Sequence, residues 1–165
     1  MAALNKQVLL AGRPKGAVTE DNFRFVEVPI GKPGAGEVLV KNEWLSLDPY
    51  MRGRMSDAKS YAKSTEIGEV MVGQTVGEVV ESHDAKFKAG DKVLTPLGWQ
   101  LYGIANAKEL TKIDAKHAPA SHYLGILGMP GMTAWFGLFE IGQPKPGDTV
   151  VTSIEKLGDL EFKLT

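Results

Sequence analysis

The sequence contains no cysteine. This absence excludes disulfide bonds, thiolate zinc sites and a cysteine nucleophile together. A chain without disulfides suits a reducing compartment, and the N-terminus has too short an apolar stretch for a signal peptide. We therefore expect a cytoplasmic protein.

The chain also lacks a strong excess of one charge and a long uninterrupted apolar run. Its formal net charge is −1, and acidic and basic residues are mixed along it, so no basic face predicts binding to nucleic acid. The longest apolar run, from Tyr123 to Ile141, is interrupted by glycines and by Pro130, which argues against a membrane span. With 165 residues, we expect one domain, or one domain and a fragment of another.

Common catalytic motifs are missing as well. The sequence has no Gly-x-Ser-x-Gly elbow, no HExxH pair and no Walker loop. His83, His117 and His122 are scattered, and no carboxylate completes a metal-binding set with them. We therefore assign no metal site and no catalytic base.

What is present is a series of short β-rich runs separated by turn residues. Several such runs at this spacing predict a sandwich or a small barrel. Gly77 lies inside the fourth run, where a glycine suggests a bulge or a tight bend. The runs are Asn5–Gly12, Phe23–Ile30, Val38–Leu47, Gly73–Ser82 and Phe87–Gly98, with one or two further strands within Trp99–Asp114.

Two segments, "FKAGDKV" and "PKPGDTV", place a Gly-Asp pair directly before a predicted strand. Glycine supplies a positive φ angle in such a turn, and the aspartate side chain bonds its own nearby backbone. These segments predict two similar turns rather than a chemical site.

The pattern changes at Ser121. The apolar spacing predicts helix over Ser121–Ile141, with Ser121 as N-cap, Pro130 in the first turn of a second helical piece and Gly142 just past the end. A β-branched strand follows at Thr149–Thr152. Helix, Gly-Asp turn and strand in this order are typical of the start of an α/β layer.

Three stretches together resemble a known family. They are "SLDPYMRGRM", "GEVVESHDAKFKAGDKVLTPLGW" and "YLGILGMPGMTAWFGLFEIGQPKPGDTVVTS". In this order and at this spacing they are quite specific, and the match runs from about Leu4 to Ser153. They resemble the zinc-independent medium-chain dehydrogenases/reductases, in the branch of the prostaglandin reductases and 2-alkenal double-bond reductases.

The resemblance implies a mainly β fold with some helix. A GroES-like β-barrel substrate domain would cover residues 1–120, and a linking helix with the first strand of a Rossmann domain would cover 121–153. Members of this family use NADPH to reduce the C=C bond of α,β-unsaturated aldehydes or ketones by hydride transfer. Tyr50 would line the substrate pocket and Trp99 would wall it, whereas Met129 and Thr133 would lie near the nicotinamide and ribose of NADP. The resemblance leaves the catalytic residues unassigned.

The sequence departs from the family after Ser153. Family members have glycines there, which receive the pyrophosphate at a helix N-terminus, but this chain has no G-x-G-x-x-G turn. We therefore expect the isolated chain to be weak or inactive as a reductase. Residues 154–165 alternate apolar and polar from Leu160 to Leu164, which predicts either a strand that closes the barrel or an unrelated tail.

A second hypothesis is a non-catalytic GroES-like module for binding or self-association. In the family, the helix at Tyr123–Ile141 packs between two domains. With one domain absent, its apolar stripe would become an interaction surface and support a homodimer. The expected partners are therefore a small-molecule enal or enone, or a second copy of the chain.

Overall fold

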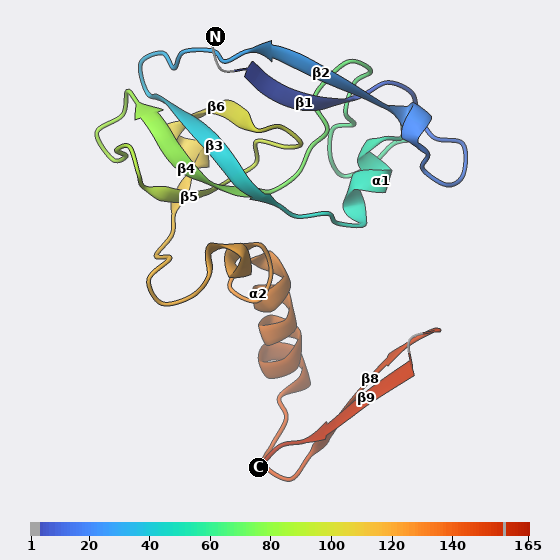
Figure 1. Ribbon diagram of the computed structural model, residues 1–165. Coiled ribbons are helices and arrows are strands. Elements are labelled where there is room, and N and C mark those ends of the chain that lie inside the picture. Colours follow the sequence, from blue (N-terminus) through green and yellow to red (C-terminus); the bar gives the residue numbers. More distant parts are fainter. Residues whose placement is uncertain (1–3, 157) are drawn as a thin grey trace. The chain divides into compact units, whose positions relative to one another are not determined.

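The computed structural model describes residues 4–156 and 158–165 and divides into two compact units (Figure 1). The first unit ends at Leu124, and the second covers Gly125–Thr165. The sequence placed this division at residue 120. Residues 1–3 and 157, which fall in the expected first domain and in the expected tail, lie outside the described residues.

The first unit is built from antiparallel strands. β1 and β2 form a hairpin, and five strands form a larger sheet in the order β6-β3-β4-β5-β7. Every predicted run overlaps an observed strand, and the last run contains two, so the mainly β expectation is confirmed. The bounds are β1 Leu4–Leu10, β2 Phe23–Pro29, β3 Glu37–Leu45, β4 Thr75–Ser82, β5 Lys92–Thr95, β6 Tyr102–Asn106 and β7 Thr111–Lys112.

The larger sheet buries a valine-rich face. Val38 and Val40 of β3 point to the same side because side chains alternate along a strand, and both are fully buried. They pack with Val79 of β4 and Val93 of β5. Burying each such side chain contributes about 1.5–3 kcal/mol, so this cluster fixes the register of the sheet.

A second apolar cluster joins the hairpin to the helix α1 (Tyr50–Arg54). This helix begins directly after Pro49, whose missing N–H costs little in a first turn. The cluster consists of the buried residues Leu10, Met51, Met55 and Met71, with Phe23 and Trp99 packed against them. Methionine fills irregular gaps well, so the cluster accommodates groups from strand, helix and loop.

The segment Trp99–Leu101 connects the hairpin to the larger sheet by backbone hydrogen bonds. The Val8 amide of β1 donates to Trp99 O at 2.9 Å, and the Leu101 amide donates to Lys6 O at 2.9 Å. Leu101 O accepts the Asn42 amide of β3 at 2.7 Å. The segment therefore satisfies backbone groups of both sheets.

Both Gly-Asp turns form as the sequence predicts. Gly90 has φ +88° and Gly147 has φ +94°. The Asp91 carboxylate accepts the Lys88 amide at 3.0 Å, and the Asp148 carboxylate accepts the Lys145 amide at 2.7 Å. In each turn, the aspartate side chain therefore bonds the backbone amide that lies three residues earlier in the chain.

Short 3₁₀ helices complete the first unit. They are η1 (Glu20–Asn22), η2 (Ala107–Glu109) and η3 (Ala120–Leu124). The predicted Ser121 N-cap is wrong, because Ser121 lies inside η3.

The second unit begins after this 3₁₀ helix and has its own helix. The predicted helix over Ser121–Ile141 is interrupted, and α2 (Met129–Trp135) has Gly128 as its N-cap. Pro130 lies in its first turn, as expected. The chain continues as the π-helix η4 (Phe136–Gly142). Gly142, expected just past the helix, is instead the last residue of η4. The next residue, Gln143, takes the left-handed conformation, with φ 46°.

The second unit ends in a β-hairpin. β8 (Thr149–Ile154) contains the predicted strand, and β9 (Gly158–Lys163) contains most of the alternating tail. β9 pairs antiparallel with β8, from Thr149 opposite Lys163 to Ile154 opposite Gly158. The predicted strand is therefore present, and within the second unit it pairs with β8.

The glycine inside β4 faces a bulge, as the sequence suggested. Gly77 pairs with Asn42, and its neighbour Val76 pairs with Trp44, so Glu43 is the extra residue of β3. A Cβ at Gly77 would collide with Lys41 O and lie 2.7 Å from Val40 Cγ1. Only glycine permits this close approach of the two backbones.

We expect Gly77→Ala to lower the free energy of unfolding by about 1–3 kcal/mol, the usual cost of overpacking. Urea unfolding followed by tryptophan fluorescence measures this change. Gly53→Ala in α1 is the matched control, because a Cβ there meets nothing within 4 Å; it should leave stability unchanged or raise it by up to about 1 kcal/mol. Equal stability of the two variants would contradict the close approach.

Candidate functional site

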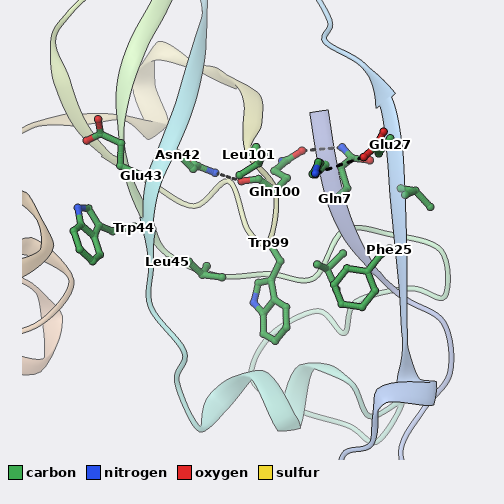
Figure 2. A pocket seen from close by; sticks show the side chains of 13 residues that line it. Gln7, Phe25, Glu27, Asn42, Glu43, Trp44, Leu45, Trp99, Gln100 and Leu101 are labelled. Atoms are coloured by element: carbon green, nitrogen blue, oxygen red, sulfur yellow. Dashed lines mark hydrogen bonds and ion pairs between the residues drawn. The ribbon is translucent and has the colours of Figure 1, made fainter. Parts of the chain in front are cut away.

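A cavity of about 640 Å³ opens in the first unit where the hairpin meets the larger sheet (Figure 2). This volume falls in the range of small-molecule sites. Four segments build the cavity, namely β1, β2, the end of β3 and the connecting segment Trp99–Leu101. The lining residues are Lys6, Gln7, Val8, Phe25, Val26, Glu27, Asn42, Glu43, Trp44, Leu45, Trp99, Gln100 and Leu101.

The cavity walls carry large apolar side chains that are not buried by the protein. Phe25 is 78% exposed and Trp44 is 54% exposed. Leu45 and Leu101 are also exposed. Isolated exposed apolar residues are ordinary, but several around one concavity mark a binding surface.

Amide side chains form part of the polar lining of the cavity, beside the charged residues Lys6, Glu27 and Glu43. Gln100 Oε1 accepts hydrogen bonds from Asn5 Nδ2 at 3.0 Å and from Gln7 Nε2 at 2.8 Å. Asn42 Nδ2 donates to Gln100 O at 2.8 Å, whereas Asn42 Oδ1 is buried without a hydrogen-bond partner in the part of the chain that the structure describes. Asn42 Oδ1 can therefore accept a further hydrogen bond. Leaving such a buried acceptor without a donor is costly.

Trp99, predicted to wall the substrate pocket, lies in the wall of this cavity. Its indole stacks on Phe23, with ring centroids 5.3 Å apart and planes 23° apart. A Cβ at Gly73 would lie only 3.2 Å from Trp99 Cδ1, so the indole packs closely on this glycine. Among residues 4–156 and 158–165, its Nε1 is buried and has no hydrogen-bond acceptor.

Tyr50, the second predicted substrate residue, is on α1 and is not one of the described residues lining the cavity. Its side chain is 37% exposed. Partial burial raises the pKa of the Tyr50 phenol above its usual value, and the nearby Asp48 carboxylate raises it further, while Arg54 opposes both. The phenol therefore keeps its proton at neutral pH and can donate a hydrogen bond.

Met129 and Thr133, predicted near the cofactor, lie in the second unit. They are four residues apart on α2, and the Thr133 hydroxyl donates to Met129 O at 2.8 Å. This bond places both residues on one face of the helix. Both side chains are exposed.

Sequence reasoning missed most of the cavity. Phe25, Trp44, Gln7 and Asn42 were not selected, although all four lie in strands that were predicted. Period-2 alternation could have placed Phe25 on one face of its run. Nothing in the sequence could have shown that Gln7 and Gln100 meet, because they are 93 residues apart.

No triad of potential metal ligands is assembled among the described residues. Likewise, no helix within residues 4–156 and 158–165 has the length and apolar content to cross a membrane.

A family profile described as the N-terminal domain of oxidoreductase matches residues 6–113. The chain belongs to this oxidoreductase family. Its relatives place it in the medium-chain dehydrogenase/reductase superfamily, beside the alkenal and prostaglandin reductases, and confirm the GroES-like fold of the first unit.

Individual relatives match almost the whole of this oxidoreductase chain. The NADPH-dependent curcumin reductase of Escherichia coli (strain K12) is 50% identical over 90% of this chain and 43% of its own length. The 2-alkenal reductase (NADP(+)-dependent) of Nicotiana tabacum is 44% identical over 90% of this chain and 45% of its own length. The chain thus spans less than half the length of these relatives.

A solved structure supports the same assignment. The crystal structure of CurA in complex with NADPH from Vibrio vulnificus has a TM-score of 0.79 and 50% sequence identity, and covers 87% of this chain and 42% of that chain.

The described residues do not fit the phosphate groups of NADPH. Such a site needs a glycine-rich turn and a helix N-terminus directly after the strand, but β8 turns back into β9. Gly131, in the first turn of α2, is also no cradle, because a Cβ there would collide with the backbone of Ile126. These residues therefore lack a pyrophosphate site.

The raised pKa of Tyr50 gives a pH prediction. The folded state holds the phenol proton more tightly than the unfolded state does, so this stabilisation is complete below about pH 10 and is lost as the pH rises through the folded pKa. Tyr50→Phe should therefore flatten the fall in stability above about pH 10. Urea midpoints at several alkaline pH values measure this, and an unchanged slope would contradict the environment described for Tyr50.

Proposed function

We propose that this chain supplies the substrate-binding domain of an NADPH-dependent reductase, which reduces the C=C bond of α,β-unsaturated aldehydes or ketones by hydride transfer. The position of Trp99 carries the proposal, because a residue assigned by family resemblance lies in the wall of a cavity of ligand size. The names of the relatives, which include a 2-alkenal reductase and a curcumin reductase, support the substrate class.

The first unit offers what an enone needs. A conjugated enone is flat and largely apolar, and it can stack on aromatic faces such as that of Trp99. Reduction moves negative charge onto the carbonyl oxygen, which a preorganised hydrogen-bond donor stabilises. The neutral, partly exposed Tyr50 hydroxyl is such a donor. We assign Tyr50 and Trp99 to substrate binding, Trp99 as an apolar wall, and no residue is assigned a catalytic role.

The cofactor would be gripped only at its nicotinamide end. Met129 and Thr133 are proposed to lie near the nicotinamide and ribose, but the phosphate contacts are missing from these residues. Several charge-assisted hydrogen bonds of about 1.5–3 kcal/mol each are thereby lost. The 165-residue chain by itself should therefore bind NADPH poorly and turn over little substrate.

A second candidate function is self-association through the second unit. Ile126, Met129, Met132 and Ile141 are all at least 65% exposed, so the unit itself does not cover them. Large apolar side chains left exposed in this way are candidates for an interaction surface.

Binding of the planar enone benzylideneacetone tests the first function. We expect it to shift the Trp99 indole N–H resonance and the Asn42 amide resonance of the isotope-labelled chain, and Trp99→Leu to weaken binding about tenfold. The absence of cysteine removes thiol addition as a complication. Trp135→Leu is the control and should bind normally.

In the same samples, NADPH fluorescence should give a dissociation constant weaker than about 0.1 mM. Micromolar binding of NADPH with turnover would contradict the weak-binding proposal. No enone binding, together with a concentration-dependent sedimentation coefficient, would favour self-association instead.

A further inference from the structure

Arg54, the last residue of α1, lies beside two tyrosine rings. Its guanidinium carbon is 5.9 Å from the centroid of Tyr50 and 5.9 Å from the centroid of Tyr61. Both distances fall within the range of cation–π attraction. Arg54 Nε is buried and has no hydrogen-bond partner in the described part of the chain, and partial desolvation of this kind strengthens the attraction to the rings.

Arg54 also fastens the loop that carries Tyr61. Arg54 Nη1 donates to Lys63 O at 2.6 Å, and Arg54 O accepts the Thr65 amide at 2.8 Å. Tyr61 itself is 88% exposed. The contacts at Arg54, rather than burial of the ring, therefore hold Tyr61 near Tyr50, and the ring remains open to a ligand.

The neighbouring arginine of α1 has a different role. Arg52 donates to Pro14 O at 3.2 Å and to Gly16 O at 2.9 Å, and it approaches neither tyrosine ring within cation–π range in the described residues. Arg52 thus anchors a loop that is distant in sequence, whereas Arg54 contacts the two tyrosines. Arg52 is therefore a matched control for Arg54.

We propose that Arg54 is a positioning residue that holds Tyr50 and Tyr61 as a pair of aromatic walls for the unsaturated substrate. This rests on the proposed function, because it takes the substrate to be a planar enone near Tyr50. A planar guanidinium suits this task better than an ammonium, since it stacks on rings and donates to Lys63 O in a fixed geometry.

The charge of Arg54 adds a chemical effect to the geometric one. A cation near the Tyr50 phenol lowers its pKa against the opposing effects of burial and Asp48. The hydroxyl keeps its proton and becomes a stronger donor toward a carbonyl oxygen that gains negative charge. Arg54 touches no reacting atom and acts through Tyr50.

The test compares Arg54→Met, Arg54→Lys and Arg52→Met in the full 165-residue chain. We expect nuclear Overhauser contacts from the Arg54 side chain to both rings in the wild type. In Arg54→Met, the contacts from the side chain of residue 54 to the two rings should be lost, the pKa of the Tyr50 phenol should rise, and benzylideneacetone should bind about tenfold more weakly. Arg52→Met should retain affinity within about twofold.

Arg54→Lys keeps the positive charge but removes the planar guanidinium, so it distinguishes the effect of charge from that of shape. It also replaces Arg54→Met in the test if that variant does not fold. It should keep the Tyr50 pKa near the wild-type value but bind the enone more weakly than the wild type does, because it lacks the planar group. The proposal is overturned if Arg54→Met or Arg54→Lys binds the enone as Arg52→Met does, or if the wild type lacks the contacts to Tyr61. If the wild type binds no enone, the proposed function fails, while the ring contacts and the phenol titration still decide whether Arg54 holds the two tyrosines.

Discussion

The first unit depends on the hydrogen bonds around Gln100. One side-chain oxygen receives amide hydrogens from Asn5 and Gln7 of β1, and the side-chain nitrogen donates to Leu97 O at 2.7 Å. The backbone oxygen of the same residue accepts Asn42 Nδ2 of β3. A short loop thus satisfies polar groups of the hairpin and of the larger sheet, and satisfied networks of this kind specify one arrangement.

This arrangement determines where aromatic side chains gather. Because Trp99 directly precedes Gln100, fixing the loop also fixes the indole against Phe23. The indole packs on the second apolar cluster, which contains Met51, Met55 and Met71, and it also lines the cavity. The same cluster supports α1 through Met51 and Met55, so the supports of Tyr50 and Trp99 are mechanically linked. In the proposed function, substrate shaping is therefore a property of the first unit. Among residues 125–156 and 158–165, no glycine-rich turn leads from a strand into a helix that could receive the phosphate groups of a nucleotide.

Local features of the fold were predictable, and long-range ones were not. The strand runs, the bulge opposite Gly77 and the two Gly-Asp turns follow from the conformational preferences of a few adjacent residues. The break before α2 escaped prediction because the close packing of Gly131 on Ile126 decides it. Trp99 was found through family resemblance, but its cavity depends on residues more than 90 positions apart, a tertiary contact that no local pattern encodes.

Amide hydrogen exchange at Val8 and Leu101 tests the central claim most directly, because both amides donate across the junction between the hairpin and the larger sheet. We predict that they exchange as slowly as the Val40 amide of β3 in the wild-type chain. In Gln100→Ala, both should exchange at least about tenfold faster while Val40 stays protected. Exchange of Val8 and Leu101 at the rate of an unfolded chain in the wild type would contradict the account.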